Sequence, residues 1–245
     1  MGVSNVYSPL NRPRNPLPRT KVGDFFIHRT VHISIPGVHR NAQLLHNRAW
    51  KLWISPQYRV GVEPEPDTKD WTWTLTRRCD ECGLAAGEIG PAEIADRAFV
   101  AAEEWVQILR SSPAVTERPE PAVWSPLEYG AHVRDVFRLF GNRVAQMVSE
   151  DDPRFANWDQ DETAIQERYG EQDPEVVAEE LEAAALSMVQ RIRSLDPADL
   201  GRTGVRSNGD EFTVETLLQY FLHDVIHHVW DVTGQQDAVS SLALE

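Results

Sequence analysis

Cysteine is nearly absent from this chain. The 245 residues include only two, Cys79 and Cys82, in the stretch "CDECG". Two cysteines so close together do not form a disulfide framework of the kind that stabilises small secreted domains. The fold must therefore rest on a hydrophobic core, for which the length and the 41% hydrophobic content are sufficient.

Long apolar runs are also lacking. No stretch approaches the roughly 18 consecutive apolar residues that suggest a membrane span. Proline and arginine interrupt the beginning of the chain, "NRPRNPLPRT", before the apolar core of a secretory signal can form. We therefore expect a cytoplasmic protein with no membrane partner.

Basic residues are scarce after residue 62. Residues 1–62 carry nine Lys or Arg and a single acid, Asp24, a net charge of +8, whereas the remaining 15 basic and 37 acidic residues give −22. A body this acidic repels phosphate backbones, which argues against nucleic acid as a partner of the main domain. A small molecule is the expected substrate.

Residues 1–62 form a basic, proline-rich leader without a sustained helical or alternating period, and it holds four of the eight histidines (His28, His32, His39 and His46). Three interpretations stay open: an arm that binds an acidic partner, a disordered extension, or a start codon placed too far upstream. We favour the last, because the composition changes sharply at Val62-Glu63. Residues 63–90 are predicted to be an irregular segment that carries the Cys-x-x-Cys pair.

Residues 91–234 are predicted to form four helices, over 91–110, 125–148, 173–195 and 213–234, followed by a tail over 235–245. Ser125, Pro126 and Glu128 make a capping box with proline at the first helical position. Thr213 is the expected cap of the last helix. The connection over about 150–172 is long for a bundle, where two to eight residues are usual, and would allow two neighbouring helices to run parallel. The expected fold is all-α, a four-helix bundle.

Three histidines are predicted to bind a metal ion. His223 and His227 are four residues apart and share one face of the last helix, whereas His228 is rotated from them by about 100° and is predicted to point elsewhere. His132 lies in the apolar stripe of the second helix. A single buried histidine is usually a neutral structural residue, but three on two facing helices favour a metal site.

Three neutral nitrogen ligands leave a divalent ion with open positions for water or substrate, as in catalytic sites. Zn²⁺ is the first choice, with Ni²⁺, Fe²⁺ and Mn²⁺ as alternatives. Asp135 and Asp231, each one turn after a predicted ligand, either orient the ligand rings or belong to a solvated helix surface, and the sequence does not decide between these roles.

Two motifs together, "VWSPLEYGAHVRDVF" and "YFLHDVIHHVWDV", resemble the DinB-like four-helix metalloprotein superfamily, which includes mycothiol- and bacillithiol-dependent thiol transferases and maleylpyruvate isomerase. The resemblance covers about residues 91–234. It implies an up-down-down-up bundle, a metal held by His132, His223 and His227, and a low-molecular-weight thiol as cosubstrate. "CDECG" and "NWDQDETA" are similar to stretches in actinobacterial members of unassigned function. The basic leader departs from the better-characterised members, and no residue identifies a bound thiol.

Two further features allow more than one interpretation. Cys79 and Cys82 are free thiols in a linker by default; alternatively, they are half of a zinc ribbon completed by leader histidines or by a second subunit. The glycine-rich "GLAAGEIGP" that follows them disfavours a thioredoxin-like role. The acidic 150–172 connection is either a solvated crossover or, in addition, a lid over the metal whose Trp158 packs against the substrate.

The expected function is a metal-dependent enzyme that activates a thiol or water, with thiol-dependent transfer or isomerisation first and hydrolysis second. Two rivals remain: a non-catalytic metal-binding or stress-response protein on the same bundle, and a plain bundle with structural histidines. The sequence assigns no catalytic acid or base, and a homodimer is compatible with it.

Overall fold

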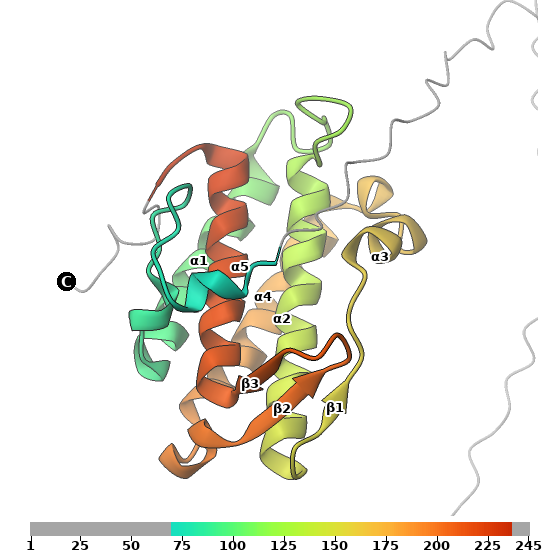
Figure 1. Cartoon of the computed structure of the whole chain (residues 1–245). Helices are drawn as coiled ribbons and strands as arrows, with labels where there is room; N and C mark the ends of the chain where they lie inside the picture. Colours follow the sequence, from blue (N-terminus) through green and yellow to red (C-terminus); the bar gives the residue numbers. More distant parts are fainter. Residues whose placement is uncertain (1–69, 237–245) are drawn as a thin grey trace, which may run out of the picture. The chain divides into compact units, whose positions relative to one another are not determined.

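The computed structural model describes residues 70–236 (Figure 1). The leader over 1–62 and the tail from residue 237 lie outside the described residues, so the three interpretations of the leader remain predictions.

Four long helices make up most of the described chain: α1 (Pro91–Ser111), α2 (Pro126–Ser149), α4 (Pro174–Arg193) and α5 (Val214–Thr233). The predicted start signals form as expected. Ser125 accepts a hydrogen bond from the Glu128 amide while the Glu128 side chain accepts from the Ser125 amide, and Thr213 caps α5. Gly234 ends α5 in the left-handed conformation, with φ +67°, which glycine adopts without strain.

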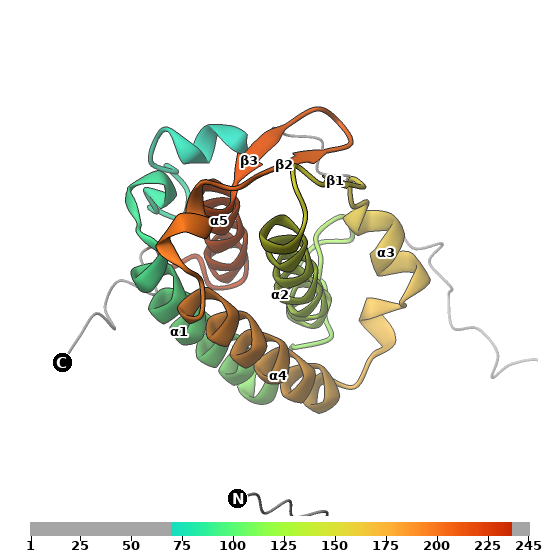
Figure 2. The same ribbon diagram turned by 90° about the horizontal axis from the view of Figure 1, so that it is seen from below.

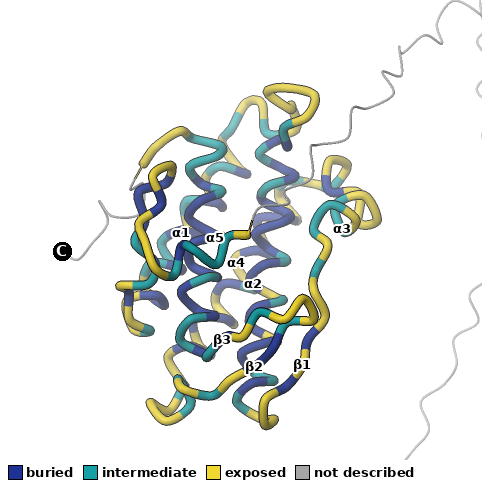
Figure 3. Tube along the Cα trace, viewed as in Figure 1, coloured by how far each residue is buried: buried dark blue, intermediate teal, exposed yellow. Residues whose placement is uncertain are grey.

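The four helices surround one core in an up-down-down-up arrangement. Each of α1 and α2 packs against both α4 and α5, as the end-on view in Figure 2 shows. In Figure 1, α2 and α4 run downward and α1 and α5 run upward. The neighbours α2 and α4 are therefore parallel, which only a long connection between them permits. The buried residues lie along the faces that the helices turn toward each other (Figure 3). The predicted bundle and its topology are confirmed.

The connection between α2 and α4 is partly ordered into short elements, namely β1 (Arg154–Phe155), α3 (Gln160–Gln166) and the 3-10 turn η3 (Tyr169–Glu171). β1 pairs in parallel with β2 (Thr203–Arg206), and β2 pairs antiparallel with β3 (Glu211–Thr213). The all-α prediction did not include this small sheet, because strands of two to four residues are too short to show an alternating pattern.

Residues 70–90, predicted to be irregular, are held against α5. They contain two 3-10 turns, η1 (Thr72–Leu75) and η2 (Ala86–Glu88), which pack on each other and on α5. The Gln219 side chain of α5 donates hydrogen bonds of 3.2 Å to the carbonyls of Gly87 and Ile89. This attachment places Cys79 and Cys82 beside the last helix of the bundle.

The capping glutamate of α2 offers a test of the fold. Glu128 is buried, and its carboxylate accepts from the Ser125 amide at 2.8 Å and from Arg118 Nε at 2.9 Å. Burial acts to raise the pKa of Glu128, but the bonds from Arg118 and Ser125 outweigh it and hold the pKa below its usual range. A lowered folded-state pKa means that the carboxylate stabilises the fold above its unfolded pKa, about 4.3, and loses this effect as the pH falls.

Glu128→Gln is therefore expected to lower the free energy of unfolding by about 1–2 kcal/mol at neutral pH. Acidification through the folded-state pKa should narrow the difference between variant and wild type, which urea denaturation at several pH values measures. Glu175→Gln, which removes an exposed ion pair with Arg110, should change stability far less. A difference at Glu128 that does not depend on pH would contradict the charge argument.

Candidate metal centres

The histidines of α2 and α5 fall into two sets of potential metal ligands. In the first, the α2–α5 set, ligand atoms of His132, Asp224 and His228 all lie within 4.8 Å of one another. In the second, the Cys–His set, the same holds for Cys79, Cys82, His223 and His227. The structure thus brings the predicted ligands His223 and His227 together but places His132 in the other set. A three-histidine site remains a prediction, and the side-chain positions favour two separate sites.

Helix periodicity explains the division. Residues 223 and 227 share one face of α5, and residues 224 and 228 lie on a face about 100° further round. The His228 ring lies closer to His132, with centroids 4.8 Å apart, than to His227, at 6.1 Å. Asp224-x-x-x-His228 has the same spacing as His223-x-x-x-His227. Sequence reasoning missed the first pair because only the packing of α5 shows which face meets α2.

A carboxylate lies at the centre of the α2–α5 set. Asp224 Oδ1 is 3.3 Å from His132 Nε2 and 3.6 Å from His228 Nε2. The other ring nitrogen of His228, Nδ1, donates to Asp231 Oδ2 at 2.7 Å. That contact holds the His228 ring with Nε2 directed toward Asp224, the arrangement in which a carboxylate orients a metal-binding histidine.

The two carboxylates considered from sequence have different partners. Asp231 orients His228, and is 3.8 Å from Nε2 of His227, the ring it was expected to serve. Asp135 binds Arg134 and accepts from the Tyr169 hydroxyl at 2.6 Å, so it holds the connection to α4 rather than a histidine ring. Of these two carboxylates, only Asp231 is placed to orient a histidine ring, that of His228.

The charge state of the α2–α5 set suits a cation. Burial lowers the pKa of His132, with Asp224 opposing the effect. Burial acts to raise the pKa of Asp224, but the bond from His132 and the neighbouring imidazoles lower it overall. A neutral His132 imidazole and an ionised Asp224 carboxylate are the forms that coordinate a divalent ion. In addition, Nδ1 of His132 is buried and has no hydrogen-bond partner within residues 70–236. The residues present therefore fit a metal.

Tryptophan side chains cover His132. The Trp158 ring stacks on the His132 ring with centroids 5.1 Å apart and planes 6° from parallel, and Trp124 lies at 5.4 Å on a tilted plane. Trp158 belongs to the 150–172 connection, where Thr163 accepts its indole N–H at 2.8 Å. The connection thus supplies part of the wall of the site, in addition to crossing the bundle.

Both sets adjoin one pocket of about 780 Å³, within the usual range for small-molecule sites. Its lining includes Asp224 and His228 of the first set, His223 and His227 of the second, and the rings of Trp124 and Trp158. The lining residues come from α2, from α5, from residues 70–90 (the N-terminal segment) and from the 150–172 connection, so the pocket depends on the tertiary fold.

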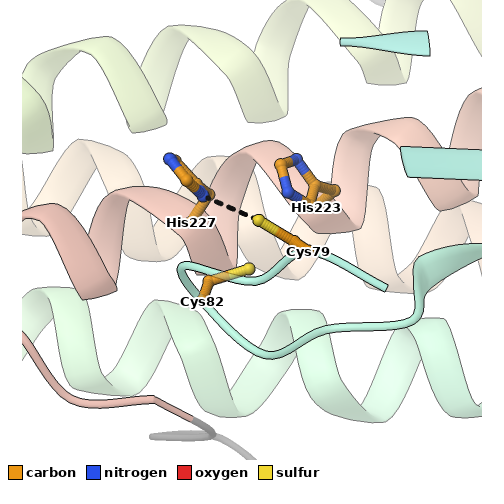
Figure 4. A group of neighbouring side chains, drawn as sticks. All are labelled: Cys79, Cys82, His223 and His227. Carbon is orange, nitrogen blue, oxygen red and sulfur yellow. Dashed lines mark hydrogen bonds between the residues drawn. The ribbon is translucent and has the colours of Figure 1, made fainter. Parts of the chain in front are cut away.

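The Cys–His set is buried where the N-terminal segment meets α5 (Figure 4). The Cys79 sulfur is 3.7 Å from Nδ1 of His227, and the His223 and His227 ring centroids are 5.0 Å apart. Burial raises the pKa of Cys82 to about 12 and lowers that of His223 to about 4. The thiols are free, as expected, but they lie in the core rather than in a linker. The nearby histidines come from α5; those of the leader lie outside the described residues.

Fold and site together define a four-helix bundle with potential metal-ligating side chains on facing helices. The family model of the DinB superfamily matches residues 95–232, more than half of the chain, and the chain belongs to this superfamily. The resemblance seen in the sequence is confirmed.

Comparison with solved structures agrees with this assignment at the level of the fold. The chain is similar to a structure described as "YfiT from Bacillus subtilis is a probable metal-dependent hydrolase with an unusual four-helix bundle topology". The TM-score is 0.53 at 13% identity, over 65% of this chain and 88% of that one. No curated protein sequence matched. Among the described residues, no helix is long and apolar enough to cross a membrane.

Proposed function

We propose that this protein is a divalent-metal-dependent enzyme whose ion is held by His132, Asp224 and His228. The observation that carries the proposal is a set of three ligands of which Asp224 and His228 line a pocket of about 780 Å³. Three protein ligands leave a position open, as in catalytic zinc sites. Two imidazoles and a carboxylate are suitable ligands for Zn²⁺. Imidazole discriminates poorly among divalent metals, so Ni²⁺, Fe²⁺ and Mn²⁺ are the alternatives. When bound, such an ion lowers the pKa of water or of a thiol and so provides a nucleophile at neutral pH.

The side chains of the chain orient and shield this site. Asp231 holds the His228 ring in an orientation in which Nε2 points into the set. Trp158 and Trp124 cover the buried His132 ring and also line the pocket. Asp224 and His228 line the pocket as well, so the substrate would meet the set at these two residues, beside apolar rings that reduce solvation and strengthen the interactions between charges.

Thiol-dependent transfer or isomerisation is the first reaction we propose. Such a reaction brings a thiol and a second organic molecule into one site, and 780 Å³ lies in the upper half of the range for small-molecule pockets. Metal-assisted hydrolysis is the second, and the likeness to the Bacillus subtilis protein described as a probable metal-dependent hydrolase favours it. All ligands of the α2–α5 set come from one chain, so neither reaction requires a homodimer.

We place the protein in the cytoplasm, acting on a small molecule. The two buried cysteines are free, and free thiols persist in a reducing compartment. The acidic charge of the chain after residue 62 disfavours an anionic polymer as its substrate.

Chelation and reconstitution test the proposed function. Full-length protein stripped of metal is expected to lose turnover of mycothiol conjugates or of simple esters and amides, and stoichiometric Zn²⁺ should restore it. Activity on thiol conjugates alone would identify a transferase or isomerase, and activity on esters or amides alone a hydrolase. Metal binding without turnover on either class would favour the non-catalytic alternative. Full activity of the metal-free protein would contradict the proposal.

His227→Ala distinguishes the two possible ligand sets. If His132, Asp224 and His228 hold the catalytic ion, this variant still binds that ion and still shows metal-dependent turnover. If His132, His223 and His227 hold it, the variant loses the ion and the turnover. Metal analysis and turnover of the reconstituted variant, measured beside wild type, decide between the two sets.

A further inference from the structure

We propose that the Cys–His set is a second, structural metal site, in which Cys79, Cys82, His223 and His227 hold one Zn²⁺ that fastens residues 70–90 to α5. This site shares no ligand with the α2–α5 set and goes beyond the proposed function. It would give the motif "CDECG" and the first histidine pair of "HDVIHH" one common role.

The four side chains converge on one point from two elements. In Figure 4, both cysteines extend from the N-terminal segment toward α5, and the Cys79 sulfur lies beside the His223 and His227 rings. All four ligand atoms are within 4.8 Å of one another, and one distance, from Cys79 Sγ to His227 Nδ1, is 3.7 Å. With zinc bonds of about 2.0–2.3 Å, the corners of a tetrahedral site lie about 3.3–3.8 Å apart. Small side-chain movements would therefore complete the site.

The ligand types and their spacing are those of structural zinc sites. Cys-x₂-Cys and His-x₃-His are the usual pairings of a Cys₂His₂ site, here separated by most of the bundle. The cysteines are on a tight turn: the Gly83 amide donates to the Cys79 carbonyl at 2.9 Å, and the Cys79 amide to the Leu84 carbonyl at 2.8 Å. Gly83 has φ +82°, so the turn takes a conformation that favours glycine. The turn directs both sulfurs to the same side.

A buried nitrogen without a partner independently points to a ligand at this site. His223 is 3% exposed, and its Nε2 has no hydrogen-bond partner within the described part of the chain. Buried polar atoms are satisfied in nearly all native structures, so one that is not suggests a missing ion or water. An ion between the sulfurs and the imidazoles would provide the partner.

Glu81 is placed to orient the second imidazole. While Nδ1 of His227 faces the Cys79 sulfur, its Nε2 lies 3.6 Å from Glu81 and 3.8 Å from Asp231. A histidine that binds zinc through one nitrogen commonly directs the other toward a carboxylate. Glu81, one of the two acids between the cysteines, would thus hold His227 with Nδ1 directed at the ion.

The set suits a structural ion and not a reacting one. Four protein ligands leave no open position, and all four residues are buried, with exposed fractions between 1% and 6%. Residues 70–90 also provide Asp70, Trp71 and Glu81 to the wall of the pocket. An ion that joins this segment to α5 would therefore keep that wall in place. Binding releases the proton of each thiol to solvent, because zinc takes cysteine as thiolate.

Metal counting on the full-length protein tests the proposal. Wild type loaded with Zn²⁺ is expected to hold two ions per chain, and Cys79→Ser/Cys82→Ser is expected to hold one and to unfold at a lower temperature. His132→Ala is the matched control: it should also lose one ion, but from the other site. The same number of ions in the double serine variant as in wild type would overturn the proposal.

Two measurements on proteins that retain both cysteines test the Cys–His site even if the double serine variant does not fold. Co²⁺ in place of zinc should give the intense near-ultraviolet thiolate-to-metal band and the visible bands of tetrahedral cobalt, and His132→Ala should keep both. Both thiols should react with a thiol reagent only after chelation. Absence of the thiolate band, or a Cys79–Cys82 disulfide in the zinc-loaded protein, would overturn the proposal. If the metal-loaded wild-type protein shows the thiolate band but no turnover, the result counts against the proposed function and not against the Cys–His site.

Discussion

Asp224→Asn is expected to remove the catalytic ion and to lower turnover by more than about 100-fold. Asp224 lies between His132 and His228, with its Oδ1 at 3.3 and 3.6 Å from the two imidazoles. Asparagine preserves the shape and the contact with His132 but takes away the charge that attracts a cation. Replacing a residue that merely orients a ligand typically costs 10- to 100-fold in metal affinity or activity, so the loss of a ligand should cost at least as much. Metal content and turnover of the reconstituted variant measure the effect.

Two control variants should impair metal binding and turnover less than Asp224→Asn does. Asp231→Asn should have a smaller effect, about 10- to 100-fold, because it loosens His228 without removing a ligand. Glu182→Gln, an exposed carboxylate on α4, should leave metal content and turnover unchanged. If Asp231→Asn impaired metal binding more than Asp224→Asn, the assignment of ligand and orienting residue would be wrong. In Asp224→Asn and Glu182→Gln, the cobalt–thiolate band of the Cys–His set should remain, since neither residue is part of that set.

Gly87→Ala is expected to destabilise the protein by at least about 1–3 kcal/mol, the usual range for overpacking. A Cβ atom at residue 87 would lie 2.0 Å from the carbonyl oxygen of Leu75. The obstructing atom belongs to the backbone, so no rotamer change relieves the clash, and η1 and η2 must move apart. The Gly87 carbonyl also accepts from Gln219, which joins this segment to α5. The variant should therefore loosen the N-terminal segment as well as lower the free energy of unfolding.

Urea denaturation and thiol reactivity measure these two effects. Cys79 and Cys82 should react faster with a thiol reagent in Gly87→Ala than in wild type, because the segment that buries them is less firmly held. Gly90→Ala is the matched control, since a Cβ there would meet nothing within 4 Å. Equal stabilities of the two variants would show that the close approach of η1 and η2 is not maintained in solution.

Local signals were sufficient to predict the bundle. Pro126 at the first helical position, the Ser125–Glu128 capping box and Gly234 after the last helix all act within a few residues, so their effect can be read without knowledge of the fold. The long 150–172 connection allowed parallel neighbours, and the family resemblance implied them. The three-stranded sheet could not be foreseen, because Arg154–Phe155 forms a strand only by pairing with residues 205 and 206.

The candidate ligands could be predicted only in part. His132, His223 and His227 were chosen from helix periodicity, and each has a position in one of the two sets. Asp224 and His228 have the same four-residue spacing as the chosen pair, and spacing alone cannot distinguish two adjacent faces of one helix. The cysteines were considered with leader histidines or a second subunit as partners, because nothing local links residue 79 to residue 227.

The sequence by itself determined the helices, their ends, the family and the residue types available for metal binding, because caps, periodicity and motifs depend on near neighbours along the chain. Only the tertiary structure decided which of these residues meet. The rotation of α5 directs Asp224 and His228 toward His132 on α2, and the docking of residues 70–90 brings Cys79 and Cys82 to His223 and His227. Both results follow from the burial of apolar faces across the whole bundle, a property that no single stretch of the sequence contains.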